Sequence, residues 1–423
     1  MLLKNAKLII KDNEYEIKDV LIVDGKISRI DDVIDVVDDV VINLKNKLVM
    51  PGMIDAHVHL REPGYTDKET IETGTLAAAK GGFTTIMVMP NIVPYPDNVD
   101  TIKEYLQLLK DKSHVNTYPY ACITKQEHGK ELVDIKEINK LGIIGYSDDG
   151  VGVANEEMMK SACELVNDCG SIIVAHTEDM NYRKKEACMH DGIRNKELGL
   201  VGIPSECEWK QFERDLKIVE KINNRYHICH MSCTESVNLL KEYKDKGLNV
   251  SGEVTTHHLL LSENDVIDES FKMNPPLRSE NDRQNLIRGL KNGVIDIIAN
   301  DHAPHTLEEK SRGMVKSPFG IVSLETSLAL LYTKLVKENI FTLEELIKFT
   351  CSNPAKLFNL NNKGHIKEGY DADLIVIDEE TVKVIDSNTF VSKGKNTPFN
   401  GIECVGWNIM TILDGKVIFK EEI

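Results

Sequence analysis

Two histidines, His57 and His59, stand two positions apart in the stretch HVHLREPG (residues 57–64). Residues i and i+2 of a β-strand point to the same face, so the two imidazoles can bind one metal ion together. The pair alone is weak evidence, because buried histidines are also commonly held by hydrogen bonds. Arg61 follows at once, and a cation beside two metal ligands would repel the metal. The arginine therefore needs a different partner.

More groups that could bind a metal follow other apolar runs: His176 after SIIVA, His230 at the end of YHICH, and Asp301 after IDIIAN. Imidazole nitrogens and carboxylate oxygens are the ligands of catalytic zinc. In YSDDG, adjacent carboxylates point to opposite sides of a strand, so only Asp148 or Asp149 can face the same place. Six candidate ligands are more than one tetrahedral zinc can bind. They fit two metals that share a bridging carboxylate and acidify one water.

The segments that must position these residues alternate between strand and helix patterns. Eight short apolar runs are predicted strands, at 53–60, 83–90, 116–123, 143–149, 171–178, 225–232, 248–259 and 294–304. Helix-period stretches separate most of them, at 67–81, 98–112, 155–168, 233–247 and 281–293, several with Asn, Asp or Thr caps and a closing Gly. This order predicts a (β/α)8 TIM-type barrel of the α/β class. The polar residues lie toward the C-terminal ends of the runs, where such barrels carry their active sites.

Both ends of the chain have a different sequence pattern, which is typical of short β-strands. Residues 5–31 alternate as short strands with turns at Asp12-Asn13 and Asp24-Gly25, and residues 364–423 repeat that pattern. Either end alone has too few strands to be stable, so we predict one small β-sandwich built from both termini. The predicted domains are this composite sandwich, residues 1–50 plus 360–423, and a catalytic barrel, residues 51–359.

The composition excludes several classes of protein. Hydrophobic residues make up 41% and charged residues 28% of the 423 residues, as in ordinary globular proteins. No apolar run approaches the ~20 residues of a membrane span, and charges interrupt the N-terminus where a signal peptide would be apolar. The net charge of −17 argues against nucleic acids and anionic membranes as partners. Nine cysteines without a CxxC pair indicate reduced thiols, and we expect a cytoplasmic protein.

Several motifs together resemble the amidohydrolase superfamily and, within it, the bacterial-type dihydroorotase family. They are GMIDAHVHLREPG, VMPN, SDDG, AHTED, CHMS, NPPLR, NDHAPH and SNPAKLFNL, which span nearly the whole chain. Many relatives bridge their metals with a carboxylated lysine, but LGIIGYSDDG has no lysine. This resembles the subclass that uses aspartate as the bridge, which favours Asp149 over Asp148. The expected metal ligands are His57, His59, Asp149, His176, His230 and Asp301.

The resemblance also implies roles for the other motif residues. Arg61 is expected to clamp a substrate carboxylate with two parallel hydrogen bonds. Family positions that help hold this carboxylate match Asn91 and His305. Positions that bind the substrate ring match Asn274 and the Phe319-Gly320 backbone. The family's motif has Pro where this chain has Thr256, ahead of His257 and His258. This departure concerns a neighbouring loop and leaves the expected ligands unchanged.

The implied reaction is the zinc-dependent, reversible cyclisation of N-carbamoyl-L-aspartate to dihydroorotate in pyrimidine biosynthesis. Asp301 would carry the proton between the attacking water and the leaving nitrogen. The resemblance implies about two Zn²⁺ per chain, bridged by Asp149, and either a homodimer or a complex with aspartate transcarbamoylase. The alternatives are another cyclic amidohydrolase, such as an allantoinase or hydantoinase, and a non-catalytic scaffold. Arg61 favours dihydroorotate, which has a carboxylate, over the substrates of allantoinases and hydantoinases, which lack it. The complete set of expected ligands argues against a non-catalytic scaffold.

Overall fold

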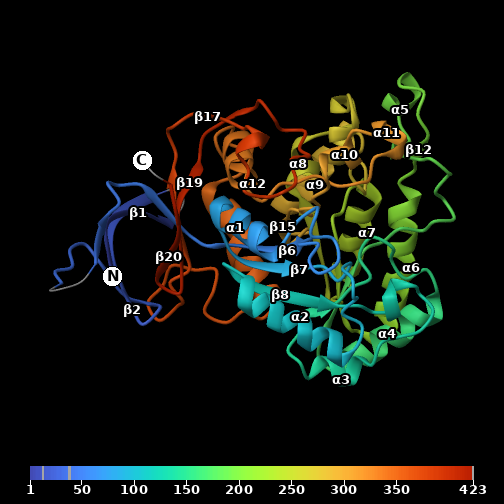
Figure 1. Cartoon of the computed structure of the whole chain (residues 1–423), viewed down its shortest axis with the longest axis horizontal. Coiled ribbons are helices and arrows are strands. Elements are labelled where there is room, and N and C mark those ends of the chain that lie inside the picture. The colour runs from blue at the N-terminus through green and yellow to red at the C-terminus, as the bar shows by residue number, and fades with distance from the viewer. Residues whose placement is uncertain (12–13, 37–39, 422–423) are drawn as a thin grey trace.

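The computed structural model describes residues 1–11, 14–36 and 40–421 and contains a nearly closed barrel of eight parallel strands (Figure 1). The strands are β6 (Met53–Val58), β7 (Phe83–Val88), β8 (Asn116–Ala121), β9 (Gly145–Tyr146), β10 (Ile172–Ala175), β13 (Arg225–Ile228), β14 (Val250–Thr255) and β15 (Ile297–Ala299). Neighbours in the sheet follow chain order, and a parallel bridge between Val58 and His302 joins its two ends. All eight predicted strands are present, so the predicted barrel is confirmed.

Helices cover the outside of the barrel, as the sequence periodicity predicts. The five predicted ones are α1 (Ile71–Gly81), α2 (Val99–Lys112), α4 (Glu156–Asp168), α7 (Thr234–Asp245) and α9 (Glu280–Lys291), and α6 (Glu206–Ile222) packs between α4 and α7. The Asn98 side chain caps α2 by accepting hydrogen bonds from the backbone of Asp100 and Thr101. Gly82 ends α1 with φ 92°, a conformation that a residue with a Cβ seldom adopts. These caps fix where each helix meets its strand.

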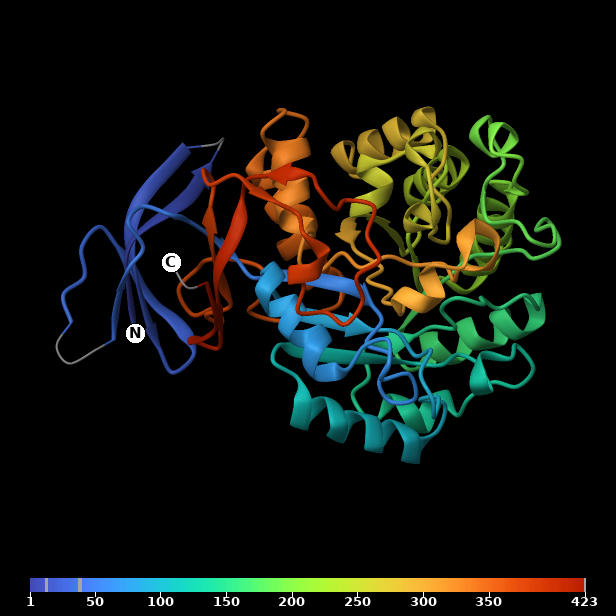
Figure 2. The same ribbon diagram turned by 45° about the horizontal axis from the view of Figure 1, so that its top comes forward.

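Strands from both ends of the chain form one second sheet beside the barrel (Figure 2). Its members are β1 (Leu2–Lys11), β2 (Glu14–Val23), β3 (Lys26–Asp31), β4 (Val41–Asn43), β5 (Leu48–Pro51), β16 (Leu374–Asp378), β19 (Trp407–Leu413) and β20 (Lys416–Lys420). N-terminal β5 pairs antiparallel with C-terminal β16, with Val49 opposite Val376. The composite unit built from both termini is therefore confirmed, whereas the boundaries at residues 50 and 360 stay a prediction. The turn at Asp24-Gly25 is present; the one at Asp12-Asn13 lies outside the described residues.

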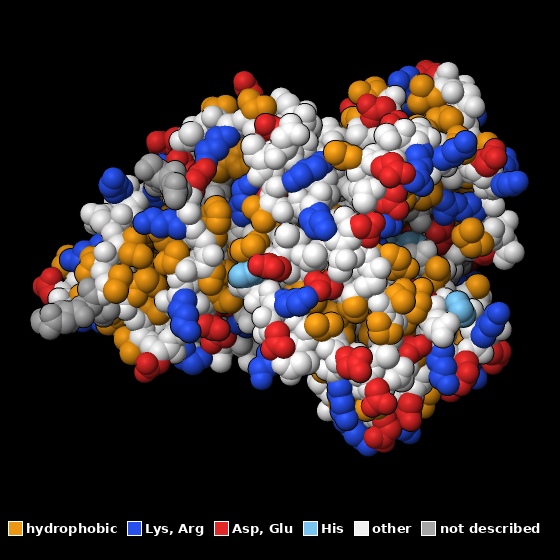
Figure 3. All heavy atoms as spheres, in the orientation of Figure 1, with side chains coloured by type: hydrophobic (Ala, Val, Ile, Leu, Met, Phe, Trp, Pro, Cys, Tyr) orange, Lys and Arg blue, Asp and Glu red, His pale blue; other side chains and the backbone are white. Residues whose placement is uncertain are grey.

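The surface and the cysteines match the composition. On the face seen in Figure 3, basic and acidic side chains are interspersed rather than gathered by sign. All nine cysteines are free, and eight of them are buried. Among the helices of the described chain, none has the length and apolar character needed to cross a membrane.

Candidate active site

The C-terminal ends of the barrel strands bring the predicted site residues together. All of them except His57 line one cavity of about 260 Å³. His57 lies on β6 with no exposed surface. His230 and Asp301 have φ values of 31° and 47°, which are uncommon for residues with a side chain and occur where a functional site holds the backbone. The chain leaves its strands abruptly at these two positions.

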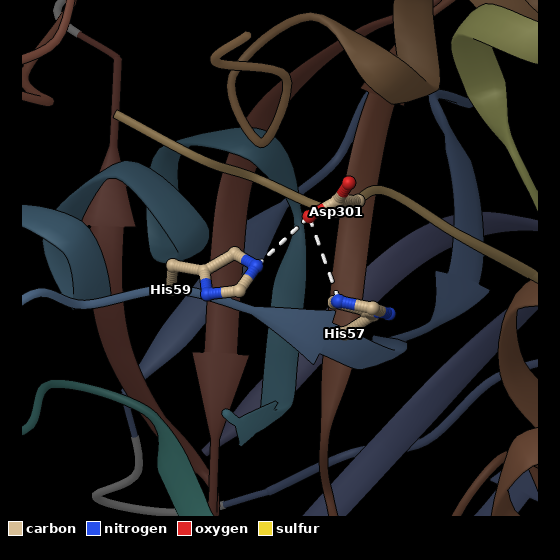
Figure 4. Close-up of side chains that lie close together, drawn as sticks. All are labelled: His57, His59 and Asp301. Atoms are coloured by element: carbon tan, nitrogen blue, oxygen red, sulfur yellow. Dashed lines mark hydrogen bonds and ion pairs between the residues drawn. The ribbon is translucent and has the colours of Figure 1, made fainter. Parts of the chain in front are cut away.

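The first cluster of possible metal ligands contains His57, His59 and Asp301 (Figure 4). Asp301 Oδ1 lies 2.9 Å from His59 Nε2 and 3.5 Å from His57 Nε2. His59 comes directly after β6, where its backbone N–H donates to the carbonyl of His302 on the opposite end of the sheet. One carboxylate oxygen and two ring nitrogens thus converge, as the spacing of the histidines predicts.

Asp149 lies between this cluster and the remaining histidines. Its Oδ1 is 3.4 Å from His57 Nε2, 3.6 Å from His176 Nδ1 and 3.8 Å from His230 Nε2. Its Oδ2 is 3.4 Å from His59 Nε2. The two oxygens of a single carboxylate thus face ligands from both groups, which is the arrangement that a bridging ligand needs.

The Asp148 carboxylate forms its hydrogen bonds outside the cavity. Its Oδ1 accepts hydrogen bonds from the backbone of Ile123 (2.8 Å) and Thr124 (3.0 Å), and its Oδ2 accepts one from the Thr124 hydroxyl. These bonds hold Asp148 outside the cavity, whereas Asp149, in the turn that follows β9, lines it. The geometry therefore agrees with the choice of Asp149 over Asp148.

Cations fit this group of side chains. Within the described chain, His57 Nε2 and Asp149 Oδ1 are buried and have no hydrogen-bond partner, although such atoms are seldom left unpaired. Burial disfavours a charged imidazole, but Asp149, Asp301 and Glu253 raise the pKa of His57 well above its usual value. Burial likewise opposes charge on His176, yet Asp149 and Glu178 raise its pKa to about 9. In the metal-free protein, protons on these rings would offset the carboxylate charges that a metal offsets when bound.

Glu253, a residue that the sequence reasoning missed, supports the ligands from below. It lies on β14 with no exposed surface, and its Oε1 accepts a hydrogen bond from His57 Nδ1 at 2.7 Å. The same oxygen accepts the backbone N–H of His230, and Oε2 lies 3.1 Å from His227 Nε2. A carboxylate on the second nitrogen fixes the tautomer and orientation of a metal-binding imidazole. A carboxylate inside the apolar run VSGEVT was the available signal.

Arg61 lies at the wall of the cavity, and among the described residues its side chain has no hydrogen bond to the histidines expected to bind metal. Its Nε donates to the carbonyl of Pro304 at 3.3 Å, and its Nη2 is 3.5 Å from His305 Nε2. No ion pair of Arg61 is present among the described residues. Burial lowers the pKa of this guanidinium, as expected for a charge that lacks a close anionic partner. Arg61 is therefore placed to bind an anion that enters the cavity.

Two more predicted residues, Asn91 and His305, adjoin Arg61 and the ligands. Asn91 Oδ1 accepts a hydrogen bond from His59 Nδ1 at 2.8 Å, and its Nδ2 lies 3.4 Å from Asp149 Oδ2. His305 Nε2 donates to the carbonyl of Phe319 at 2.9 Å. Burial and the nearby Arg61 lower the pKa of His305 to about 3, so its ring is neutral.

The cavity lining also includes Asn274 and two charged residues to which the sequence motifs gave no role, Glu178 and Arg183. Asn274 Nδ2 donates to Glu178 Oε2 at 2.8 Å, and the same oxygen is 3.3 Å from His176 Nε2. Arg183 pairs with the other oxygen of Glu178, and its guanidinium lies 4.8 Å from the centre of the Phe319 ring. Glu178 belongs to the motif AHTED, which indicated that this segment contributes to the site but gave no role for Glu178.

Comparisons with known proteins agree with this geometry. The model of the family described as "Dihydro-orotase-like" matches residues 46–236, and that of the "Amidohydrolase family" matches residues 332–419. The dihydroorotases of Bacillus cytotoxicus and Bacillus cereus are each 46% identical over all of this chain and 98% of their own length. The L-hydantoinase (dihydropyrimidinase) of Arthrobacter aurescens has a TM-score of 0.88 at 26% identity, over 100% of this chain and 96% of that one. The resemblance predicted from the motifs is confirmed: the chain belongs to the dihydroorotase family of cyclic amide hydrolases.

Proposed function

We propose that the protein catalyses the reversible cyclisation of N-carbamoyl-L-aspartate to (S)-dihydroorotate, a step of pyrimidine biosynthesis. The observation that carries this proposal is Arg61, a guanidinium without an ion pair in the described chain, beside a cluster of metal ligands. Dihydroorotate has both a cyclic amide and a carboxylate, so it can occupy both places at once. Allantoin and hydantoin lack this carboxylate and would leave Arg61 unpaired.

The proposed cofactor is two Zn²⁺ per chain. The ligands would be His57, His59 and Asp301 for one ion, and His176 and His230 for the other, with Asp149 shared between them. Imidazole and carboxylate groups match the donor preference of zinc, and the unpartnered His57 Nε2 and Asp149 Oδ1 support binding of a cation here. When bound, zinc lowers the pKa of a water and polarises a substrate carbonyl.

The proposed proton carrier is Asp301. Burial raises its pKa, but His57, His59 and His230 outweigh burial and hold the pKa well below the usual range. The carboxylate is therefore ionised at neutral pH and can accept a proton from the attacking water. It then passes this proton to the ring nitrogen as the amide bond breaks, and ring closure runs the same transfer backwards.

The remaining residues would hold the substrate. Arg61 can offer two parallel N–H donors to the substrate carboxylate, with Asn91 and His305 beside it. Asn274, Phe319 and Gly320 also line the cavity, and they would bind the ring. Rigid placement of the substrate ring against the Asp301 carboxylate would increase the reaction rate by several orders of magnitude.

A cytoplasmic location accompanies this role, since the absence of a membrane-spanning helix in the described chain is compatible with it. The small-molecule partner is the substrate itself. A homodimer and a complex with aspartate transcarbamoylase stay predictions, which sedimentation of the protein with and without the transcarbamoylase distinguishes.

A substrate comparison tests the proposal. The purified protein is assayed with dihydroorotate, allantoin, hydantoin and dihydrouracil, and its metal content is measured by mass spectrometry in the same samples. We expect turnover of dihydroorotate to exceed that of the uncharged amides by at least about thirtyfold, since a buried charge pair is worth about 2 kcal/mol or more. Comparable turnover of hydantoin or allantoin would overturn the assignment.

A further inference from the structure

The segment that carries Phe319 and Gly320 is attached to the barrel by two buried lysines. We call residues 306–320 the strap; it follows His305 and contains the short helices α10 (Leu307–Lys310) and α11 (Gly313–Lys316). Lys310 lies within the strap, and Lys272 lies on the neighbouring segment before Asn274. Their exposed fractions are 6% and 3%, whereas lysines are almost never this buried unless they are paired.

The Lys310 ammonium is enclosed by backbone carbonyls. Its Nζ donates to Lys272 O (3.2 Å), Pro318 O (3.2 Å) and Gly320 O (3.0 Å). An ammonium has three N–H donors, so all of them are used. Two of the acceptors flank Phe319. The side chain thereby fixes the backbone immediately before and after this residue.

Lys272 fastens the other half of the strap. Its Nζ donates to the carbonyls of Val315 (3.1 Å) and Ser317 (2.6 Å) and lies 4.3 Å from the centre of the Phe319 ring. The backbone N–H of Gly320 donates in return to the carbonyl of Lys272 at 3.0 Å. A cation over an aromatic face adds a further attraction.

Asn396, from the C-terminal part of the chain, holds the far end of the strap. Its Nδ2 donates to Gly320 O at 3.0 Å, and its Oδ1 accepts the backbone N–H of His305 at 3.2 Å. Two of the residues expected to hold the substrate, His305 and Gly320, are therefore fixed to the same amide. The strap is held on both sides, and the lysines supply the side that faces Asn274.

We propose that Lys310 and Lys272 are positioning residues, whose ammonium groups hold the Phe319-Gly320 backbone in place to bind the substrate ring. This inference rests on the proposed function for its kinetic consequence, but not for its structural one. Neither lysine lines the cavity, so both act through the strap. An apolar side chain at position 310 would remove one donor from each of these three carbonyls. The Lys272 and Gly320 carbonyls would keep the donors Gly320 N–H and Asn396 Nδ2, but the Pro318 carbonyl would have no other donor in the described chain, which destabilises this conformation.

The charged form of Lys310 is the one present near neutral pH. Burial and the neighbouring Lys272 lower its pKa to about 8, while the more distant carboxylates of Glu269 and Asp268 act in the opposite direction. At pH 7 most of the molecules therefore have the three-donor ammonium. Measurements at this pH compare the intact lysine with its substitutes.

Hydrogen exchange tests the structural part without any substrate. In Lys310→Met, amides of the strap, including that of Gly320, should exchange at least about tenfold faster than in the wild type, because one net hydrogen bond corresponds to about that factor. The matched control is Lys316→Met, which removes an exposed lysine from the same strap and should leave exchange unchanged. Lys310→Gln, which keeps a neutral donor, serves if Lys310→Met does not fold. Unchanged exchange in the folded variant overturns the inference.

Kinetics test the functional part. For Lys310→Met and Lys272→Met we expect KM for dihydroorotate to rise at least about tenfold, with a much smaller change in kcat and unchanged metal content, since a loosened strap weakens binding before it alters the reacting groups. An unchanged KM beside faster exchange would confine the lysines to stability and overturn the positioning role. Absence of dihydroorotase activity in the wild type would contradict the proposed function alone. The exchange result would still show whether Lys310 holds the strap backbone in place.

Discussion

Replacing Arg61 by methionine tests the reasoning most directly, because this residue is proposed to distinguish dihydroorotate from uncharged cyclic amides. Methionine keeps much of the length of the arginine stem and removes the charge. The substitution removes the hydrogen bond from Nε to Pro304 O and the 3.5 Å contact of Nη2 with His305 Nε2. One such bond contributes about 1 kcal/mol to the free energy of unfolding, so the variant should fold.

The magnitude follows from the position of Arg61 at the cavity wall. Removal of the guanidinium would leave the substrate carboxylate partly desolvated and without its partner, which costs roughly 2–5 kcal/mol. At about 1.4 kcal/mol per tenfold, kcat/KM for dihydroorotate should fall by about thirty- to several-thousand-fold. Arg61→Lys should recover only part of this loss, because a compact ammonium cannot form two parallel hydrogen bonds to a carboxylate.

The assay is steady-state hydrolysis of dihydroorotate, with zinc content measured on the same preparations. Zinc should stay unchanged, since the contacts of Arg61 are with Pro304 and His305 rather than with the ligand nitrogens of the histidines. Arg29→Met is a matched control, because Arg29 is an exposed arginine on β3 that pairs with Asp31. A near-normal kcat/KM in Arg61→Met would refute the reasoning and favour a hydantoinase-like substrate.

Further measurements address the metal site. Prolonged chelation should abolish activity and zinc should restore it, whereas full activity of demonstrably metal-free protein would exclude a metal-dependent enzyme. Asp149→Ala should lose activity, and reconstitution should be indifferent to bicarbonate; density for a carboxylated lysine would contradict this. Because Asp149 and Glu178 raise the pKa of His176 to about 9, metal must displace a proton at pH 7. Metal affinity should therefore increase with pH up to about 9, with proton release detected by calorimetry in two buffers; a pH-independent affinity would contradict the assignment. Glu253→Gln, which weakens the acceptor for His57 Nδ1, should lower metal affinity about 10- to 100-fold, as determined by competition with a chelator; unchanged affinity would remove its orienting role.

Much of the fold follows from local patterns. The eight apolar runs and the helix periods between them predict the barrel, since each pattern depends only on neighbouring residues. The composite sandwich also follows, because either end of the chain alone has too few strands. Helix α7 shows the limit at the boundaries: it begins after Cys233, which makes no side-chain capping bond, rather than at a conventional cap. Asp282 of α9 instead accepts hydrogen bonds from the backbone N–H and the hydroxyl of Thr234, the first residue of α7.

The grouping of the candidate ligands in one place could also be predicted, because each lies toward the C-terminal end of a predicted strand and such ends meet at one side of a barrel. The residues that support the ligands could not. Glu253 reads as one more position of an apolar strand, and its pairing with His57 joins residues 196 positions apart. Lys310 reads as an exposed helical lysine in LEEK, although three carbonyls enclose it. Such roles depend on how distant segments pack, which local periodicity does not contain.

The structure also explains why Arg61 can follow two candidate metal ligands so closely. Arg61 has φ 61°, an uncommon conformation for a residue with a side chain, and the chain turns there as it leaves β6. His57 and His59 therefore face Asp301 and Asp149, while Arg61 contacts Pro304 and His305 at the wall. An anionic substrate between the two would be attracted by both the metals and the guanidinium. An anion bound between the two positive centres would reduce the repulsion between them, and this electrostatic gain would add to its affinity. An uncharged ring would not gain this affinity.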